Sequence, residues 1–386
     1  MNINLPGGAY TLREPVTWPV VERPAAGRVV YAAAHVVADP LGDNTPGSPA
    51  AVDWDATLRF RRHLWSYGLR VADAMDTAQR NMGLDWAATK ELIRRSADEA
   101  RSFGDPAALV ACGAGTDHAP DAADLRAITA AYAEQLETVQ TAGAGVIIMA
   151  SRQLARVASG PKDYHQVYGE LLEGADRPVI LHWLGPMFDP QLAGYWGSPD
   201  VGAATESFLE LIHAHASMVD GVKVSLLDEE HEVGLRAALP AGVRLYTGDD
   251  FNYPSLIKSG SHALLGIFDA IAPAAAAALR ALDAAEQGTG AEATRNFALY
   301  DEILAPTVPL SRKIFESPTY NYKTGIVFLA WLNGHQDAFA MVNGAQSARS
   351  LVHLSEVFRL ADQAGLLADQ ELAVRRMQAL LEVNGL

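Results

Sequence analysis

The feature that most constrains this sequence is the regular alternation of short apolar runs with longer amphipathic segments. Eight apolar runs follow one another at residues 29–34, 69–75, 108–112, 146–149, 179–182, 221–224, 243–247 and 263–267. Most are apolar at successive positions, as in parallel strands that are covered on both faces. Helical patterns lie between them at residues 53–67, 85–102, 120–141 and 203–215. Eight strand–helix repeats predict a (β/α)8 TIM barrel of the α/β class.

The strand pattern ends near residue 273, and only helical patterns follow it. An Ala-rich segment at residues 274–286 is followed, after the short loop Gly288-Thr289-Gly290, by further helical segments up to residue 386. We therefore expect three regions. These are an N-terminal extension of residues 1–28, a TIM barrel of residues 29–273, and a C-terminal helical extension of residues 274–386 that packs on the barrel.

Composition limits the partners and the location that we expect. The net charge of −16 argues against nucleic acid or an anionic membrane surface as a partner. The single cysteine, Cys112, cannot form an intrachain disulfide and fits a reducing compartment. No run approaches the roughly 20 apolar residues of a membrane span. The first 24 residues contain no apolar core like that of a signal peptide. We expect a soluble, cytoplasmic protein.

Active-site residues of a parallel barrel gather where its strands end. Lys223 is the only lysine at such a position, at the end of the run Gly221-Val222-Lys223-Val224. Burial lowers the pKa of a lysine, and the neutral amine can then attack a carbonyl carbon to form a Schiff base. The alternative role of such a lysine is to close a strand and extend its amine to water. Its position in the barrel favours the nucleophile.

Several of these segments resemble the dihydrodipicolinate synthase / N-acetylneuraminate lyase superfamily of class I aldolases. Gly221-Val222-Lys223-Val224-Ser225 is similar to the segment around the Schiff-base lysine of that family. The stretches at residues 177–186, 247–250 and 111–116 are similar to family strands and strand-end turns that lie in the same order. The resemblance extends from residue 29 to about 334. It places the chain in a distant branch, of the kind catalogued as a domain of unknown function.

The resemblance implies a role for three residues. Lys223 would be the Schiff-base nucleophile, and His182 stands where the family has a catalytic tyrosine. Thr77 keeps the first hydroxyl of a turn in which Ala78 replaces the second. The implied activity is that of a lyase, either an aldolase or a dehydratase, which needs no cofactor and no metal. Its substrate would be a 2-oxo acid or a compound derived from a keto sugar.

The remaining strand-end residues are candidates for binding this small-molecule substrate. They are His35, Asp76, Ala78, Ser151, Arg152, Trp183, Ser225, Gly248, Asp249 and Gly266. Ser151 and Arg152 stand where the family has a second tyrosine, and Trp183 could stack on a sugar ring. Arg80 replaces a family glutamate, either as an anion contact or as a solvated residue at the start of a helix.

Two other functions stay open at this point. One is a metal-assisted barrel lyase or isomerase that uses His35, Asp76 and His182, although no paired histidine motif lies at the strand ends. The other is a barrel that binds a sugar acid without catalysis. The resemblance also implies a homo-oligomer, either a dimer or a tetramer.

Overall fold

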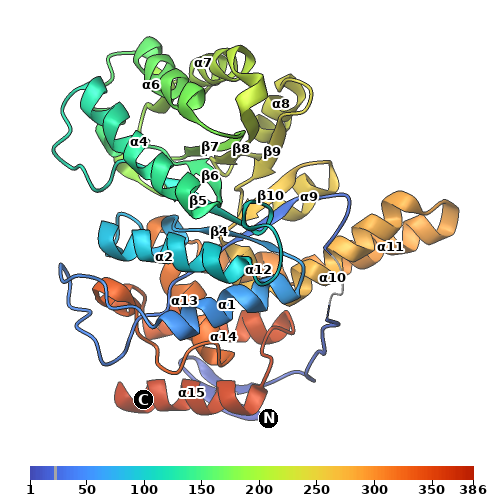
Figure 1. The fold of residues 1–386 in the computed structure, drawn as a ribbon. Helices are drawn as coiled ribbons and strands as arrows, with labels where there is room; N and C mark the ends of the chain where they lie inside the picture. The colour runs from blue at the N-terminus through green and yellow to red at the C-terminus, as the bar shows by residue number, and fades with distance from the viewer. Residues whose placement is uncertain (21–23) are drawn as a thin grey trace.

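The computed structural model describes residues 1–20 and 24–386, and its centre is a closed barrel of eight parallel strands (Figure 1). The order around the barrel is β10-β3-β4-β5-β6-β7-β8-β9, so the last strand pairs with the first. The strands are β3 (Val30–Ala33), β4 (Arg70–Asp73), β5 (Val110–Ala114), β6 (Gly145–Ile148), β7 (Val179–Leu184), β8 (Val219–Ser225), β9 (Arg244–Thr247) and β10 (His262–Leu265). The predicted TIM barrel is confirmed, with each predicted strand in its place.

Helices surround the barrel and connect its strands. They are α1 (Trp54–Ser66), α2 (Trp86–Ala100), α3 (Pro106–Leu109), α4 (Leu125–Ala142), α5 (Arg152–Val157), α6 (Pro161–Gly174), α7 (Val201–Ala214), α8 (Glu229–Ala238), α9 (Tyr253–Lys258) and α10 (Ile267–Gln287). Aspartates begin many of them, and Asp53 and Asp85 accept hydrogen bonds from the backbone N–H groups of Ala56 and Ala88.

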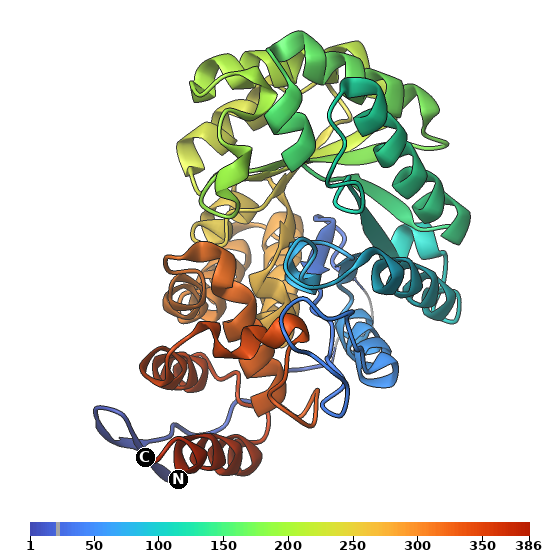
Figure 2. The same ribbon diagram turned by 90° about the vertical axis from the view of Figure 1, so that its left-hand side faces the viewer.

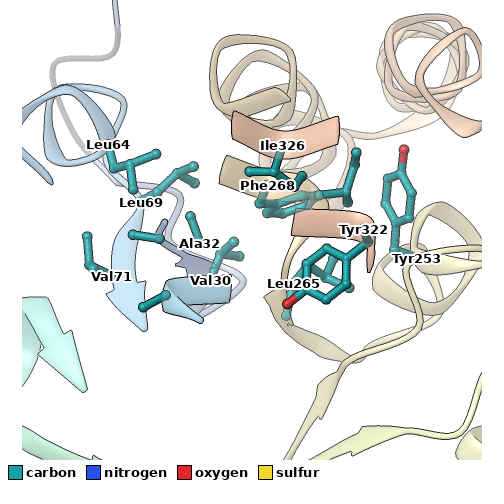
Figure 3. Close-up of a cluster of buried hydrophobic side chains, with 14 of the residues drawn as sticks. Val30, Ala32, Leu64, Leu69, Val71, Tyr253, Leu265, Phe268, Tyr322 and Ile326 are labelled. Atoms are coloured by element: carbon teal, nitrogen blue, oxygen red, sulfur yellow. The ribbon is translucent and has the colours of Figure 1, made fainter. Parts of the chain in front are cut away.

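Side chains alternate between the two faces of the barrel strands. An inner cluster fills the barrel with Tyr31, Ala33, Ala72, Met75, Ala111, Ile147, Met149, Ile180, Tyr246 and Leu264. The outer faces pack against the helices: Figure 3 shows Val30, Ala32 and Val71 beside Leu64 and Leu69. This alternation directs Lys223 inward and its neighbours Val222 and Val224 outward.

The C-terminal region contains α11 (Gly290–Leu304), α12 (Thr307–Ile314), α13 (Tyr322–Leu332), α14 (Leu351–Gln363) and α15 (Gln370–Val383). Apart from α11, these helices lie on one side of the barrel, as Figures 1 and 2 show. Every residue of α13 is buried, because this helix lies between the barrel and the outer helices. In Figure 3 its Ile326 and Tyr322 lie beside Phe268 and Leu265. Helix α11 pairs with α10 and extends away from the barrel in Figure 1.

Some element boundaries differ from the sequence prediction. Helix α10 begins at Ile267 rather than at residue 274, so the expected division at residue 273 falls inside it. Pro273 does not start this helix, and the backbone departs from helical geometry at Ile271, two residues before it. The strand expected from residue 108 begins at Val110, because Asp105 caps the short helix α3 with Pro106 at its start.

The N-terminal extension contains a β-hairpin that the sequence pattern did not predict. Strands β1 (Asn2–Leu5) and β2 (Gly8–Thr11) pair antiparallel. The Tyr10 hydroxyl donates to Asp362 at 2.7 Å, and the Arg13 backbone N–H donates to the same carboxylate at 3.0 Å. The hairpin and α15 lie at the same side of the molecule in Figures 1 and 2, and Figure 1 marks the two termini at opposite ends of α15. Among the described residues, no helix is long and apolar enough to cross a membrane.

A buried carboxyl group behind β9 makes stability depend on pH. Glu232 on α8 accepts hydrogen bonds from Thr247 Oγ1 at 2.8 Å and from Ser261 Oγ at 3.0 Å. Burial raises the pKa of Glu232 to about 8. Between its ordinary pKa and this raised value, the folded protein holds a proton that the unfolded chain has lost. The free energy of unfolding therefore falls as pH rises through this window, by at most about 1.4 kcal/mol for each pH unit.

We expect Glu232→Gln to remove much of this loss. The variant should be more stable than the wild type at pH 8.5, and the difference should shrink at pH 5, where Glu232 is protonated in the folded protein. Urea unfolding of both proteins at the two pH values measures it. An equal loss of stability in wild type and variant would contradict a raised pKa at Glu232.

Candidate active site

Lys223 lies near the carboxyl end of β8, inside the barrel. It pairs in register with His182 of β7 and Tyr246 of β9. The residue is only 7% exposed, and no described residue makes a hydrogen bond to its amine. Burial lowers the pKa of Lys223, and the charges of Asp76 and Asp250 oppose this effect. The amine is therefore neutral in a larger fraction of molecules than a surface lysine would be.

The Lys223 side chain borders a small cavity at the carboxyl ends of the strands. The cavity is lined by Ala33, Met75, Asp76, Thr77, Leu184, Phe188, Lys223, Ser225, Asp250, Gly266 and Tyr322. Its volume is about 10 Å³, close to the space that one water needs. A substrate could enter only if a covering side chain moved. Phe188 is one of the lining side chains, and its ring packs against Phe315 and Tyr322.

The C-terminal region supplies a tyrosine to this cavity. The Tyr322 hydroxyl, on the first residue of α13, lies 2.8 Å from Thr77 Oγ1. Phe315 stacks on the Tyr322 ring with the two centroids 4.3 Å apart. A side chain at Gly266 would lie 2.9 Å from the Phe315 ring, so glycine lets these rings approach the barrel mouth. Burial raises the pKa of Tyr322 well above its ordinary value, and the phenol stays neutral.

Two carboxyl groups act on Lys223: Asp250 follows the adjacent strand β9, and Asp76 follows β4 on the opposite side of the barrel. Asp250 accepts a hydrogen bond from the Ile267 backbone N–H at 2.8 Å. Burial raises the pKa of Asp250 to about 7, although this hydrogen bond and Lys223 act in the opposite direction. Asp76 begins a 3₁₀ turn (Asp76–Ala78), and its Oδ2 is buried without a hydrogen-bond partner among the described residues. Asp250 can therefore exchange a proton near neutral pH.

His182 lies inside the barrel next to Lys223. Its Nε2 is 3.4 Å from Ser225 Oγ, and its Nδ1 has no partner among the described residues. Burial, assisted by the charge of Lys223, lowers the pKa of His182 well below its ordinary value. The imidazole is neutral and offers one donor and one acceptor. Ser225, which lines the cavity, connects His182 to it.

Gly248 packs directly against the lysine. A side chain at this position would lie 2.6 Å from the Val224 carbonyl oxygen and 3.0 Å from Lys223 Cε. Glycine therefore sets the path of the lysine side chain between β8 and β9. The absence of a side chain at Gly248 leaves room for Lys223, as its absence at Gly266 leaves room for the Phe315 ring.

Two residues considered for substrate contact have other partners. Trp183 points outward from β7 into a cluster with Trp196, Phe208 and His231, so it cannot stack on a sugar in the barrel mouth. Strand alternation explains this position, because its neighbour His182 points inward. Arg80 is neither solvated nor open to an anion. It is buried, and it donates to Asp117, to Gln135 and to the carbonyl oxygens of Ala74 and Gly113.

Five more residues from the predicted set do not line the cavity. His35 binds Asp269, with Nδ1 and Oδ2 2.8 Å apart. Asp249 accepts the backbone N–H groups of Phe251 and Asn252, which holds the turn after β9. Ala78 is buried in the hydrophobic core.

Ser151 and Arg152 also make structural contacts. Ser151 caps α5 and lies 2.6 Å from Thr116 Oγ1, measured between the two hydroxyl oxygens. Arg152 Nε donates to Asp189 at 2.6 Å. The structure thus gathers Lys223, Thr77, Asp76, Ser225 and Gly266 at one cavity and adds Asp250 and Tyr322 to them. Asp250 had a sequence signal, since it closes the strand-end motif Thr247-Gly248-Asp249-Asp250.

The described residues contain no cluster of three or more His, Cys, Asp or Glu side chains that could hold a metal ion. His35 and His182, the histidines considered for a metal, have separate partners in Asp269 and Ser225. The polar side-chain groups that line the cavity are the Lys223 amine, two carboxyl groups and three hydroxyls.

Comparison with solved structures agrees with this architecture. The dihydrodipicolinate synthase from Aquifex aeolicus superposes with a TM-score of 0.64 at 12% identity, over 88% of this chain and 99% of that chain. The 4-hydroxy-tetrahydrodipicolinate synthase from Methylacidiphilum fumariolicum SolV gives 0.64 at 13% identity, over 92% and 99%. A chloride-inhibited dihydrodipicolinate synthase from Acinetobacter baumannii, complexed with pyruvate, gives 0.62 at 15%, over 88% and 100%.

The fold is therefore that of the dihydrodipicolinate synthases, and the resemblance seen in the sequence is confirmed at this level. The family described as "Protein of unknown function (DUF993)" matches residues 5–386, so the chain belongs to that family. No curated protein matches the sequence.

Proposed function

We propose that this protein is a class I lyase, an aldolase or a dehydratase, whose Lys223 forms a Schiff base with a keto substrate. The observation that carries the proposal is the environment of Lys223. Its amine is buried at an inward strand end, has a lowered pKa, and borders a cavity with two carboxyl groups. The dihydrodipicolinate synthase fold supports it.

The chemistry follows from the groups at the cavity. The neutral amine attacks the ketone carbon, and loss of water leaves a protonated imine that withdraws electrons from the adjacent carbon. The imine lowers the activation free energy for either of two reactions. In an aldolase a carbon–carbon bond breaks, and in a dehydratase a C–H bond breaks and the β-hydroxyl is then lost. Asp250 and the Tyr322–Thr77 pair would carry the protons, since Asp250 titrates near neutrality and the phenol remains neutral.

The polar groups of the cavity favour a keto-sugar-derived substrate over a simple 2-oxo acid. Its lining presents the carboxyl groups of Asp76 and Asp250 and the hydroxyls of Thr77, Ser225 and Tyr322. Lys223 is the only cation among the described residues that line it. These groups can form hydrogen bonds with the hydroxyls of a keto-sugar-derived substrate. They are less suited to the negative charge of a substrate carboxylate. We therefore place a polyhydroxylated keto compound ahead of a simple 2-oxo acid such as pyruvate.

Reductive trapping tests the proposal. The protein is incubated with pyruvate, a 2-oxo-3-deoxy sugar acid or dihydroxyacetone, reduced with borohydride and weighed by intact-mass spectrometry. We expect a covalent adduct that peptide mapping places on Lys223, with more adduct from the hydroxylated compounds. A folded protein that forms no adduct with any of the three would contradict the proposal.

The pH dependence of trapping tests the role of Asp250. Its ionised carboxylate raises the pKa of Lys223 against the effect of burial. In Asp250→Asn this contribution is lost, so the amine becomes neutral at lower pH. We expect the midpoint of the rate of adduct formation against pH to move to lower pH. Glu292→Gln, which neutralises an exposed acid on α11, should keep the wild-type midpoint. An unchanged midpoint in Asp250→Asn would show that the two groups are not coupled.

A further inference from the structure

A second cavity lies outside the barrel, between the barrel helices and the C-terminal region. Its volume is about 220 Å³, and five segments line it: the N-terminal arm at residues 16–18, α1 with Tyr67 after it, α10, α13 with residues 333–335 after it, and the loop at residues 365–368. No lining residue is shared with the cavity at Lys223. The arm is held in place by Trp18, whose Nε1 donates to the Gly365 carbonyl oxygen at 2.8 Å.

A buried carboxylate forms part of the wall. The Asp269 side chain is 1% exposed, and its Oδ2 accepts the His35 backbone N–H and faces His35 Nδ1, both at 2.8 Å. The other oxygen, Oδ1, is buried without a hydrogen-bond partner among the described residues. An unsatisfied buried acceptor is costly, and natural structures leave few of them without a functional reason. A ligand that donates a hydrogen bond to Oδ1 would satisfy this acceptor.

The remaining polar groups of the wall carry no charge. His63 and His335 lie with their ring centroids 4.2 Å apart, and the described residues offer no hydrogen-bond partner to either ring. Burial lowers the pKa of both, to about 3 for His335. Among the described residues of the lining, Asp269 is the one with a carboxyl group, and its Oδ1 has no hydrogen-bond partner. A cation is the complementary ligand.

Aromatic rings surround the same space. Trp18, Phe60 and Tyr67 line it together with the aliphatic side chains of Leu329 and Leu366. Aromatic faces attract organic cations, and more strongly where water is excluded. The volume is below the roughly 300–1,000 Å³ of sites for drug-sized ligands, so a smaller molecule fits.

We infer that this cavity is a second binding site, which takes a small organic ammonium compound with an apolar or aromatic body. The ammonium group would donate to Asp269, and the body would lie among the aromatic side chains. This inference does not depend on the imine chemistry proposed for Lys223.

Calorimetric titration with benzylamine tests the inference, and benzyl alcohol serves as the uncharged probe of similar shape. In 150 mM salt at pH 7.5 we expect benzylamine to bind at least ten times more tightly than benzyl alcohol. Asp269→Asn, which removes the charge, and Ala270→Phe, which fills the cavity, should each weaken benzylamine binding at least tenfold. Ala270 lines the cavity and makes no hydrogen bond to His35. Ala270→Phe therefore still tests the site if Asp269→Asn does not fold.

Two further variants show whether the site is specific. Lys223→Ala should keep the wild-type affinity, because it lies at the other cavity, and Glu292→Gln should keep it because only a surface charge is lost. The inference is overturned if benzylamine does not bind, if the alcohol binds equally well, or if either cavity variant folds and keeps the wild-type affinity.

Discussion

Lys223→Ala protein, reduced with borohydride in the presence of the compound that labels the wild type, is expected to gain no mass. The reason is chemical: the imine nitrogen is the Lys223 amine, and alanine has none. The side chain is buried but is not part of a hydrogen-bond network among the described residues, so its removal leaves the fold intact. Circular dichroism and intact mass on the same sample check both points.

Lys323→Ala is the matched control. Lys323 is a second buried lysine, and burial lowers its pKa to about 8. Its amine, however, donates to the Tyr320 carbonyl oxygen at 3.1 Å and lies over the Tyr322 ring. We expect this variant to keep its adduct on Lys223. An adduct that persists in Lys223→Ala and disappears in Lys323→Ala would move the nucleophile to Lys323 and refute the assignment.

Tyr322→Phe is expected to slow adduct formation by about 10²–10⁴-fold, the usual contribution of a positioned acid–base group. Attack on the ketone and loss of water both require proton transfer beside the new bond. The variant removes only the oxygen that faces Thr77 at 2.8 Å, while the ring keeps its stacking on Phe315. Rapid-quench trapping over time measures the rate. The final extent of trapping should stay close to that of the wild type.

Tyr320→Phe provides the comparison for this experiment. Tyr320 lies two residues earlier and is 38% exposed, so the loss of its hydroxyl should not change the rate. If Tyr322→Phe forms the adduct at the wild-type rate, the proton passes through another group, and Asp250 becomes the leading candidate. A similar loss of rate in both variants would indicate a general disturbance at the start of α13.

The sequence determined the barrel because hydrophobic periodicity is a local property. Each of the eight apolar runs is long enough to form a buried strand, and the segments between them supply helices with aspartates at their starts. The sequence also predicts that Lys223 lies at the mouth of the barrel. Lys223 stands near the end of a predicted strand, and the carboxyl ends of parallel strands lie on the same side of a barrel. Both inferences need only the order of residues along the chain.

Side-chain direction at the strand ends was harder to predict. Trp183 and His182 are neighbours in the sequence, yet one faces the helices and the other the barrel interior. A shift of one residue in the alternation exchanges the two, and the sequence does not fix that phase where a strand ends. Arg80 shows a similar difficulty, because its partners Asp117 and Gln135 come from later segments.

The sequence by itself therefore determined the class of fold and the candidate nucleophile. Only the tertiary structure decided the surroundings of that nucleophile. Tyr322 lies 99 positions after Lys223 in a region outside the barrel repeat, and packing of α13 on the barrel brings it to Thr77. The cavity at Asp269 likewise requires five segments from both ends of the chain. Contacts between distant segments depend on how whole elements pack, and no local pattern of residues records that packing.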